Sequence, residues 1–267
     1  MRTVLFVSLA VLALPADSPA AIQARAVEYR DGDTVLEGYL AFDDAKVTAG
    51  AASNAPGVLI IHQWMGLTDN EKRRARMLAE RGYVAFAADI YGKGARPRDR
   101  SEAPKAAGLY KGDRKLFRKR LNLGLDELRK QAGVDAKRIA AIGYCFGGTG
   151  VLELGRSGAD VAGLVSFHGG LDSPSPADGK NVRAKVLVLH GADDPFVPAA
   201  DIEAFKKELN DAKVDWQMVY YSGAVHAFTQ KEAGNDASRG AAYQENADRR
   251  SWAALRAFLE EIFTGAR

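Results

Sequence analysis

The 267-residue sequence predicts an α/β fold in which helices cover both faces of a mostly parallel sheet. Two observations carry this prediction. Short apolar runs without polar alternation recur along the chain, as expected of strands buried on both faces, and segments with helical spacing separate them. The composition, with 47% hydrophobic and 27% charged residues, is that of an ordinary globular protein.

Residues 1–21 are expected to be a secretory signal peptide. A short basic start is followed by an apolar stretch and by small residues up to Ala20 and Ala21. The apolar stretch is shorter than the about 20 residues that a membrane span needs. We expect cleavage near Ala20 or Ala21, with Ala26 as an alternative, and an exported protein that is periplasmic or secreted. A buried N-terminal helix is the competing interpretation.

The mature chain, residues 22–267, is expected to form a single domain, since no linker or internal repeat divides it. It begins with an antiparallel hairpin of residues 26–29 and 35–42, because the Asp-Gly-Asp sequence at 31–33 favours a turn. Residues 45–56 are small and polar and are expected to form a loop.

A strand, a helix and a second strand are expected after the hairpin. Residues 57–62 read GVLIIH, a continuous apolar run typical of a strand buried on both faces. Asp69 can cap a helix that runs to about Arg81, where apolar residues recur at helical spacing, and Gly82 ends it. Residues 83–88 are again apolar and predict the next buried strand.

The middle of the chain is more polar. Residues 89–104 are basic, rich in glycine and proline and without periodicity, so we expect a surface loop. Residues 116–132 have the pattern of a basic amphipathic helix, whose charges are expected to form a solvated face. An apolar strand at 139–142 and a helix at 146–154 follow.

The last third returns to alternating strands and helices. Apolar runs predict strands at 162–167, 185–190 and 216–221. A helix is expected at 199–210, between the last two strands. Residues 241–263 have apolar positions at three- and four-residue spacing, which predicts a long amphipathic helix.

The turn after the strand at 139–142 matches a nucleophile elbow, Gly-x-nucleophile-x-Gly, with Cys145 as the nucleophile. Gly143 and Gly147 flank the cysteine, where the turn is strained and the helix packs close to the strand. A helix N-terminus beside the sulfur favours the thiolate, the form that attacks. Cys145 is the only cysteine, so no internal disulfide can form, and a free thiol in an exported protein suggests a reactive role. A buried structural cysteine is the alternative.

Two further polar residues are expected at the carboxyl ends of strands, where such sheets bind ligands. Asp194 follows the strand at 185–190, and His226 follows the last strand. The chain order of nucleophile, acid and histidine is that of an α/β-hydrolase triad. In such a triad His226 accepts the thiol proton, and Asp194 orients the imidazole and stabilises its cation.

Other residues compete for these two roles. Asp193 could replace Asp194, and either aspartate could instead cap the helix that follows. The histidines His62, His168 and His190 also end apolar strands, where we expect them to make fixed hydrogen bonds in the core. The triad histidine belongs on a loop after the last strand, which favours His226.

An oxyanion hole needs two preorganised N–H donors. The residue after the nucleophile, Phe146, is expected to supply one of them. The loop that follows the strand at 57–62 is expected to supply the other, from Trp64.

The charge balance and the motifs argue against several other classes of partner. With 37 basic and 34 acidic residues, the net charge of +3 gives no reason to expect nucleic acid or a membrane as partner. No His-Glu-x-x-His motif and no paired Cys/His spacing occur, so no metal site is expected. The Gly-Lys-Gly at 92–94 lacks the last glycine of a dinucleotide-binding motif. We expect a small-molecule substrate and a monomer or small homo-oligomer.

The sequence resembles the dienelactone hydrolase family. The cysteine elbow is the most distinctive shared feature, and the shared motifs span nearly the whole mature chain in the right order. They are Gly143-Tyr144-Cys145-Phe146-Gly147-Gly148, Gly191…Asp194…Val197-Pro198, His226-Ala227-Phe228 and His62-Gln63-Trp64-Met65-Gly66-Leu67. The resemblance implies an α/β-hydrolase fold, no cofactor, and hydrolysis of lactones or small carboxylic esters through a thioester intermediate.

The chain departs from the family pattern in its substrate-binding residues. Family members have a glutamate at the position of Gln63, and glutamine can neither accept the thiol proton nor carry charge. They also bind the substrate carboxylate with two arginines, whose positions match Lys93 and Gln230 here. At most one cation is retained, so a neutral ester or lactone is a better candidate than dienelactone itself. Phe196 and Phe228, with Trp64 and Phe146, could line an acyl or aryl pocket, or could partly belong to the core.

Two other functions stay open. The chain could be a non-catalytic binding protein with the same fold, because fold does not determine function. Thioesterase or phosphotriesterase activity could occur on the same residues. A complete triad argues against the binding protein, and the absence of a second cysteine argues against a redox role.

Overall fold

The structure is a computed structural model that describes residues 21–47 and 54–265. The expected signal peptide lies outside the described residues up to residue 20, and so does part of the loop expected at 45–56. The first strand begins at Ile22, which already pairs with Asp43. Cleavage at Ala26 would therefore remove half of a strand that belongs to the sheet.

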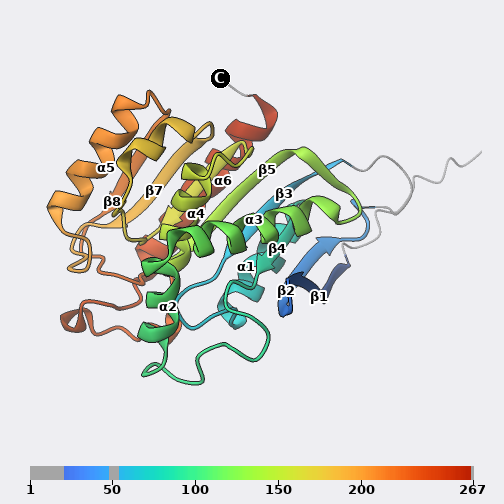
Figure 1. Cartoon of the computed structure of the whole chain (residues 1–267), viewed down its shortest axis with the longest axis horizontal. Helices are drawn as coiled ribbons and strands as arrows, with labels where there is room; N and C mark the ends of the chain where they lie inside the picture. Colours follow the sequence, from blue (N-terminus) through green and yellow to red (C-terminus); the bar gives the residue numbers. More distant parts are fainter. Residues whose placement is uncertain (1–20, 48–53, 266–267) are drawn as a thin grey trace, which may run out of the picture.

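Within the described residues, eight strands form one sheet in the order β1-β2-β4-β3-β5-β6-β7-β8 (Figure 1). The pairs β1/β2 and β2/β4 are antiparallel, and every other neighbouring pair is parallel. The strands are β1 (Ile22–Asp31), β2 (Thr34–Asp43), β3 (Ala55–Ile61), β4 (Val84–Ala88), β5 (Val134–Tyr144), β6 (Gly163–Phe167), β7 (Lys185–Gly191) and β8 (Trp216–Tyr221). The prediction of a mostly parallel sheet is confirmed.

Helices lie on both sides of this sheet (Figure 1). Helices α3, α4 and α5 contribute to the core on one face, and α1 and α6 to the core on the other. The α-helices of the described residues are α1 (Asp69–Ala79), α2 (Ala103–Gly112), α3 (Arg114–Lys130), α4 (Phe146–Arg156), α5 (Ala199–Asp211) and α6 (Glu245–Thr264). Short 3₁₀ helices are η1 (Pro176–Asn181), η2 (Lys231–Ala233) and η3 (Ala237–Arg239). None of the described helices combines the length and apolar character needed to cross a bilayer.

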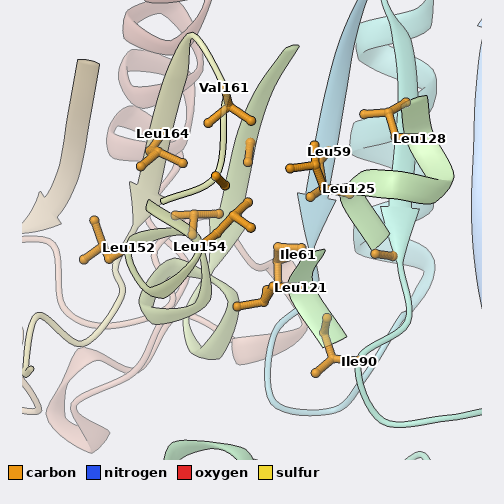
Figure 2. Close-up of a cluster of buried hydrophobic side chains, with 14 of the residues drawn as sticks. Leu59, Ile61, Ile90, Leu121, Leu125, Leu128, Leu152, Leu154, Val161 and Leu164 are labelled. Atoms are coloured by element: carbon orange, nitrogen blue, oxygen red, sulfur yellow. The ribbon is translucent and has the colours of Figure 1, made fainter. Parts of the chain in front are cut away.

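Strand β3 explains why the strands are continuous apolar runs in the sequence. Successive side chains of a strand point to opposite faces of the sheet. Leu59 and Ile61 belong to the core beneath α3 and α4, where Figure 2 shows Leu59 near Leu125 and Ile61 near Leu121. Val58 and Ile60 belong to the core beneath α1 and α6, and these four side chains of β3 are fully buried. Because both faces are covered, neither set can be polar.

Two local expectations differ from the structure. Helix α1 is capped by Thr68 and not by Asp69, because the Glu71 carboxylate accepts from the Thr68 N–H (2.8 Å) and completes a capping box. Helix α2 was not expected, since it follows a loop rich in glycine and proline. Its buried residues Ala103, Ala107 and Tyr110 do recur at helical spacing, and this was the signal that could have revealed it.

Candidate active site

Three parallel strands bring the candidate catalytic side chains to one edge of the sheet. Cys145 directly follows β5, Asp194 follows β7, and His226 follows β8. Because β5, β6, β7 and β8 are neighbours and run parallel, their carboxyl ends lie side by side. Residues that are up to 81 positions apart in the sequence therefore meet there.

The turn at Cys145 has the strained backbone that a nucleophile elbow requires. Cys145 has φ 54° and ψ −113°, a left-handed conformation that a side chain with a Cβ rarely adopts. A Cβ on Gly143 would overlap the Gly147 carbonyl, and a Cβ on Gly147 would overlap the Ile61 carbonyl of β3. The two glycines let α4 begin directly above the ends of β3 and β5, so the expected reason for both glycines is confirmed.

The side chains of Cys145, His226 and Asp194 form a continuous hydrogen-bonded chain. His226 Nε2 lies 3.1 Å from Cys145 Sγ, and His226 Nδ1 lies 2.8 Å from Asp194 Oδ2. The other oxygen of Asp194, Oδ1, accepts from the Phe196 N–H at 2.9 Å. Asp193 is exposed, and within the described residues no hydrogen bond or ion pair links its carboxylate to His226. Of the two aspartates, the structure therefore brings only Asp194 to the imidazole.

The electrostatics of this chain favour a thiolate and an imidazolium. Burial of the Cys145 thiol opposes its ionisation, but the charge and the hydrogen bond of His226 outweigh burial, and the pKa of Cys145 falls below its usual value. Burial likewise opposes the charge on His226, yet the thiolate and Asp194 together raise the pKa of His226 to about 10. Each group stabilises the charged form of the other. The sulfur is thus prepared to act as a nucleophile at neutral pH.

Two backbone N–H groups contribute to the lowered pKa of Cys145. Hydrogen bonding from the amides of Phe146 and Trp64 to the thiolate adds to the effect of His226. Phe146 is the first residue of α4, and Trp64 lies in the loop after β3. These donors are the two that the sequence predicts for an oxyanion hole, and they converge from different elements on one point.

The loop that carries His226 is held by a neighbouring segment of the chain. The His226 N–H donates to Gly240 O (3.1 Å), and the Ala242 N–H donates to His226 O (3.0 Å). Ala227, the next residue, has a φ of 60°, which turns the chain sharply after the histidine. Bonds on both sides of the histidine backbone limit how far its ring can move.

A buried arginine supports this loop from behind. Arg74 of α1 donates to Thr229 O at 3.2 Å and forms an ion pair with Asp248 of α6. Its guanidinium lies over the rings of Tyr144 and Trp252, 5.7 and 5.2 Å from their centroids. One side chain thus ties α1, α6 and the His226 loop together. Sequence reasoning missed Arg74, because a charged residue on an amphipathic helix is usually exposed.

The other histidines lie outside the chain of catalytic candidates. His62 Nδ1 is 2.7 Å from Gln63 O, and His168 Nε2 is 2.8 Å from Thr229 Oγ1, so the expectation of fixed hydrogen bonds is confirmed for both. It is wrong for His190, whose Nδ1 has no hydrogen-bond partner within the described part of the chain. The His190 ring instead packs edge-on against Tyr220.

The predicted substrate-binding residues divide into two groups. Phe196 is 60% exposed and its ring lies edge-on to His226, 5.5 Å between centroids, so it is available to a ligand at the site. Gln230 ends the backbone turn that begins at Ala227, the residue after His226. Its Nε2 is buried without a partner among the described residues. Gln63 is buried, and its Oε1 accepts from the Met65 N–H at 3.0 Å, which shapes the Trp64 loop.

Two of these residues have other partners in the structure. Lys93 Nζ forms ion pairs with Glu28 at 2.5 Å and Glu37 at 2.8 Å, so its charge is already bound by two carboxylates of β1 and β2. Phe228 is fully buried and packs against His168 and Tyr221, which makes it a core residue. The substrate-binding roles expected for Lys93 and Phe228 are therefore corrected.

Tyr91 is a site residue that sequence reasoning missed. Its hydroxyl donates to Trp64 O at 2.9 Å, and its ring packs against His62 and Phe146. Tyr91 comes shortly after the carboxyl end of β4, a position that could have marked it as a candidate. No group of His, Cys, Asp or Glu in the described ranges has an arrangement that could hold a metal ion.

Comparisons with known proteins identify the family and the fold. The family model described as "Dienelactone hydrolase family" matches residues 42–263. A solved dienelactone hydrolase-like promiscuous phosphotriesterase from metagenomic libraries is 40% identical, with a TM-score of 0.84, covering 91% of this chain and 99% of that one. A Bradyrhizobium protein named as a probable 2-oxo-3-(5-oxofuran-2-ylidene)propanoate lactonase is 30% identical over 78% of this chain and 86% of its own length. A dienelactone hydrolase from Anabaena variabilis, 18% identical with a TM-score of 0.64 over 90% of this chain and 97% of that one, shares the fold.

Proposed function

This chain belongs to the dienelactone hydrolase family, and from that premise we propose that it hydrolyses carboxylic esters or lactones with Cys145 as the nucleophile. The family implies a hydrolase that acts on a small-molecule substrate. The observation that carries the proposal is the hydrogen-bonded chain from Cys145 Sγ through His226 to Asp194, at 3.1 and 2.8 Å. A protein that only bound its ligand would have no need of a strained thiolate beside an imidazolium.

The first half-reaction transfers the acyl group to the cysteine. The Cys145 thiolate attacks the carbonyl carbon, a C–S bond forms, and the carbonyl oxygen becomes an oxyanion that the N–H groups of Phe146 and Trp64 can stabilise. As the C–O bond to the leaving group breaks, His226 donates its proton to the departing alkoxide. Asp194 keeps the Nδ1 proton of His226 in place and stabilises its cation before that transfer.

The second half-reaction releases the acid. Neutral His226 accepts a proton from a water molecule, and the resulting hydroxide adds to the thioester carbonyl. The same two N–H groups stabilise the second oxyanion. When the intermediate collapses, the C–S bond breaks and the thiolate re-forms beside the imidazolium. In a lactone both products stay joined as one hydroxy acid.

The cations near the site favour a neutral substrate. Lys93 is bound by Glu28 and Glu37, and Gln230 carries no charge. Neither Lys93 nor Gln230 can bind a substrate carboxylate bidentately as an arginine does. We therefore propose neutral esters or lactones, with Phe196 contacting the acyl or aryl part of the substrate.

The test is a burst assay with p-nitrophenyl acetate and butyrate, before and after treatment with iodoacetamide. We expect turnover to fall in step with a single alkylation of the only cysteine, followed by intact mass. Cys145→Ala, with an unchanged circular dichroism spectrum, is the matched control. Turnover that survives complete alkylation or this substitution would contradict the role of Cys145. No turnover with a slowly reacting thiol would favour a binding protein on the same fold.

A second activity, the hydrolysis of phosphotriesters, is proposed because a relative that is 40% identical is named for it. The same thiolate and N–H donors can serve a phosphoryl centre, whose oxygen also gains negative charge during attack. Turnover of paraoxon that disappears in Cys145→Ala would support this activity. Turnover that persists in the variant would assign it to a contaminant.

We also propose that the protein is exported, because residues 1–21 have the composition of a signal peptide. Expression of the full sequence in a Gram-negative host, fractionation and N-terminal mass analysis test this. We expect a periplasmic product that begins near residue 21 or 22. A cytoplasmic product that keeps Met1 would contradict it.

A further inference from the structure

His62 is a fully buried histidine that makes two hydrogen bonds to backbone groups of different segments. It directly follows β3 and opens the loop that carries Trp64. Its Nδ1 lies 2.7 Å from Gln63 O, and its Nε2 accepts from the Ile90 N–H at 3.1 Å.

The two partners determine which nitrogen of His62 carries the proton. A backbone N–H can only donate, so Nε2 must be the acceptor of the bond from Ile90. A carbonyl oxygen can only accept, so Nδ1 must carry the proton and donate it to Gln63 O. Burial lowers the pKa of His62, which keeps the ring neutral. A neutral ring with its proton on Nδ1 satisfies both bonds.

The bond to Gln63 acts on the same peptide group that supplies a proposed oxyanion donor. The carbonyl of Gln63 and the N–H of Trp64 belong to one planar unit, so holding the carbonyl fixes the direction of the N–H. A hydrogen bond accepted by the carbonyl also polarises the amide and strengthens its N–H as a donor. The Tyr91 hydroxyl holds the next carbonyl, Trp64 O, at 2.9 Å.

His62 also contacts the residue that supplies the second donor. Its ring stacks on the ring of Phe146, with 5.7 Å between centroids and 16° between planes. Phe146 belongs to α4, and Trp64 belongs to the loop after β3. His62 contacts both elements, through the ring of Phe146 and through the carbonyl of Gln63. Their relative position is therefore set in part by one side chain.

We propose that His62 is a positioning residue of the oxyanion hole, acting through its Nδ1 hydrogen bond to the Gln63–Trp64 peptide group. The inference rests on the proposed esterase function. His62 does not touch the substrate. The Trp64 N–H also contributes to the lowered pKa of Cys145, so a small effect on the reactivity of the thiol is expected, and the larger effect is expected on acylation, which forms an oxyanion. A residue that only stabilised the core would affect folding and both reactions together.

Two substitutions separate the two hydrogen bonds of the ring. In His62→Asn, the side-chain amide can take the place of Nδ1 and keep the donor to Gln63 O, while the bond from Ile90 is lost. In His62→Gln, the longer side chain can keep the acceptor for the Ile90 N–H, while the bond to Gln63 O is lost. Both variants lose one buried hydrogen bond, so a purely structural role predicts similar losses in both.

The experiment measures two reactions of Cys145 in the wild type and in both variants. The rate of acylation by p-nitrophenyl acetate depends on the oxyanion hole, whereas alkylation by iodoacetamide forms no oxyanion. We expect the rate at which Cys145 is acylated in the His62→Gln variant to fall about 10- to 100-fold. This is less than the loss of about 10²- to 10³-fold for a deleted donor. Acylation by His62→Asn should fall by less, and alkylation should stay within about threefold in both. Thermal melts check that both variants are folded.

The outcomes separate this inference from the proposed function. Equal loss of acylation in the two variants, or a parallel loss of acylation and alkylation in His62→Gln, overturns the positioning role and leaves the esterase intact. A wild-type protein that is alkylated but never acylated overturns the esterase and the positioning role with it. Selective loss of acylation in His62→Gln supports the inference.

Discussion

Replacing Asp194 by asparagine tests the proposed triad most directly, because the structure predicts how the new amide will be oriented. Asp194 Oδ1 accepts from the Phe196 N–H, and Oδ2 accepts from His226 Nδ1. In Asp194→Asn, the amide oxygen is expected to stay on the Phe196 N–H, because that partner can only donate. The amide NH₂ then faces His226 Nδ1 and forces the ring to accept there. The ring proton moves to Nε2, and Nε2 can then no longer accept the thiol proton.

The size of the effect follows from the lost charge and the wrong tautomer. The carboxylate of Asp194 is fully buried and the imidazole side chain of His226 is 14% exposed, so solvent screens their interaction little. Unit charges about 4 Å apart interact by about 4 kcal/mol at an effective dielectric constant of about 20. That loss corresponds to about 10³-fold, and the wrong tautomer in a serine-protease triad costs about 10⁴-fold. We expect Asp194→Asn to lower ester turnover by at least about 10³-fold.

The assay pairs this variant with Asp193→Asn, which changes an exposed neighbour. Initial rates with p-nitrophenyl acetate and alkylation by iodoacetamide are measured across pH for both variants. Asp193→Asn should stay within about threefold of the wild type. Asp194→Asn should need a higher pH for alkylation, because a less stable imidazolium supports the thiolate less. An Asp194→Asn protein within tenfold of the wild type, or a more damaging Asp193→Asn, would refute the reasoning.

Four further outcomes are expected. Cys145→Ser should retain the fold but lose at least about 10³-fold in turnover, because a serine is not ionised by the same imidazole; near wild-type rates would contradict a thiolate mechanism. In the pH profile of turnover, the acid limb should lie below the usual pKa of cysteine, because the pKa of Cys145 is lowered. Activity should be lost again near pH 10, where His226 gives up its proton. An acid limb at pH 8.5 or above would contradict the ion pair. Gly147→Ala should lower both the melting temperature and activity, because the new Cβ overlaps the end of β3; a wild-type melt would show that the elbow can relax. Arg74→Met should lower the free energy of unfolding in urea by about 3–5 kcal/mol, because it leaves the carboxylate of Asp248 in α6 unpaired. The control Arg76→Met, at an exposed position, should lower it by under about 1 kcal/mol. Equal losses in the two variants would contradict the structural role of Arg74.

The sequence alone determined the strands and the turn at the cysteine. Runs such as 57–62 are apolar at every position, and only a strand covered on both faces requires that over so short a length. The glycines at 143 and 147 indicated that the helix after the cysteine packs close to the strand before it, whereas the contact of Gly147 with β3 is seen only in the structure. These features are local, because each depends on the conformation of a few consecutive residues. Element ends were less accurate, as at Thr68, where two residues compete for one cap.

Only the tertiary structure decided which polar groups meet. Asp193 and Asp194 are equivalent in the sequence, and the turn after β7 presents one to His226 and the other to solvent. Lys93 matched a substrate-binding position until Glu28 and Glu37, more than 50 residues earlier in the chain, proved to bind it. His62 likewise has its second partner 28 residues away. Periodicity and turn chemistry specify the backbone of each element, whereas the partners of a polar side chain depend on packing between elements that are distant in the sequence.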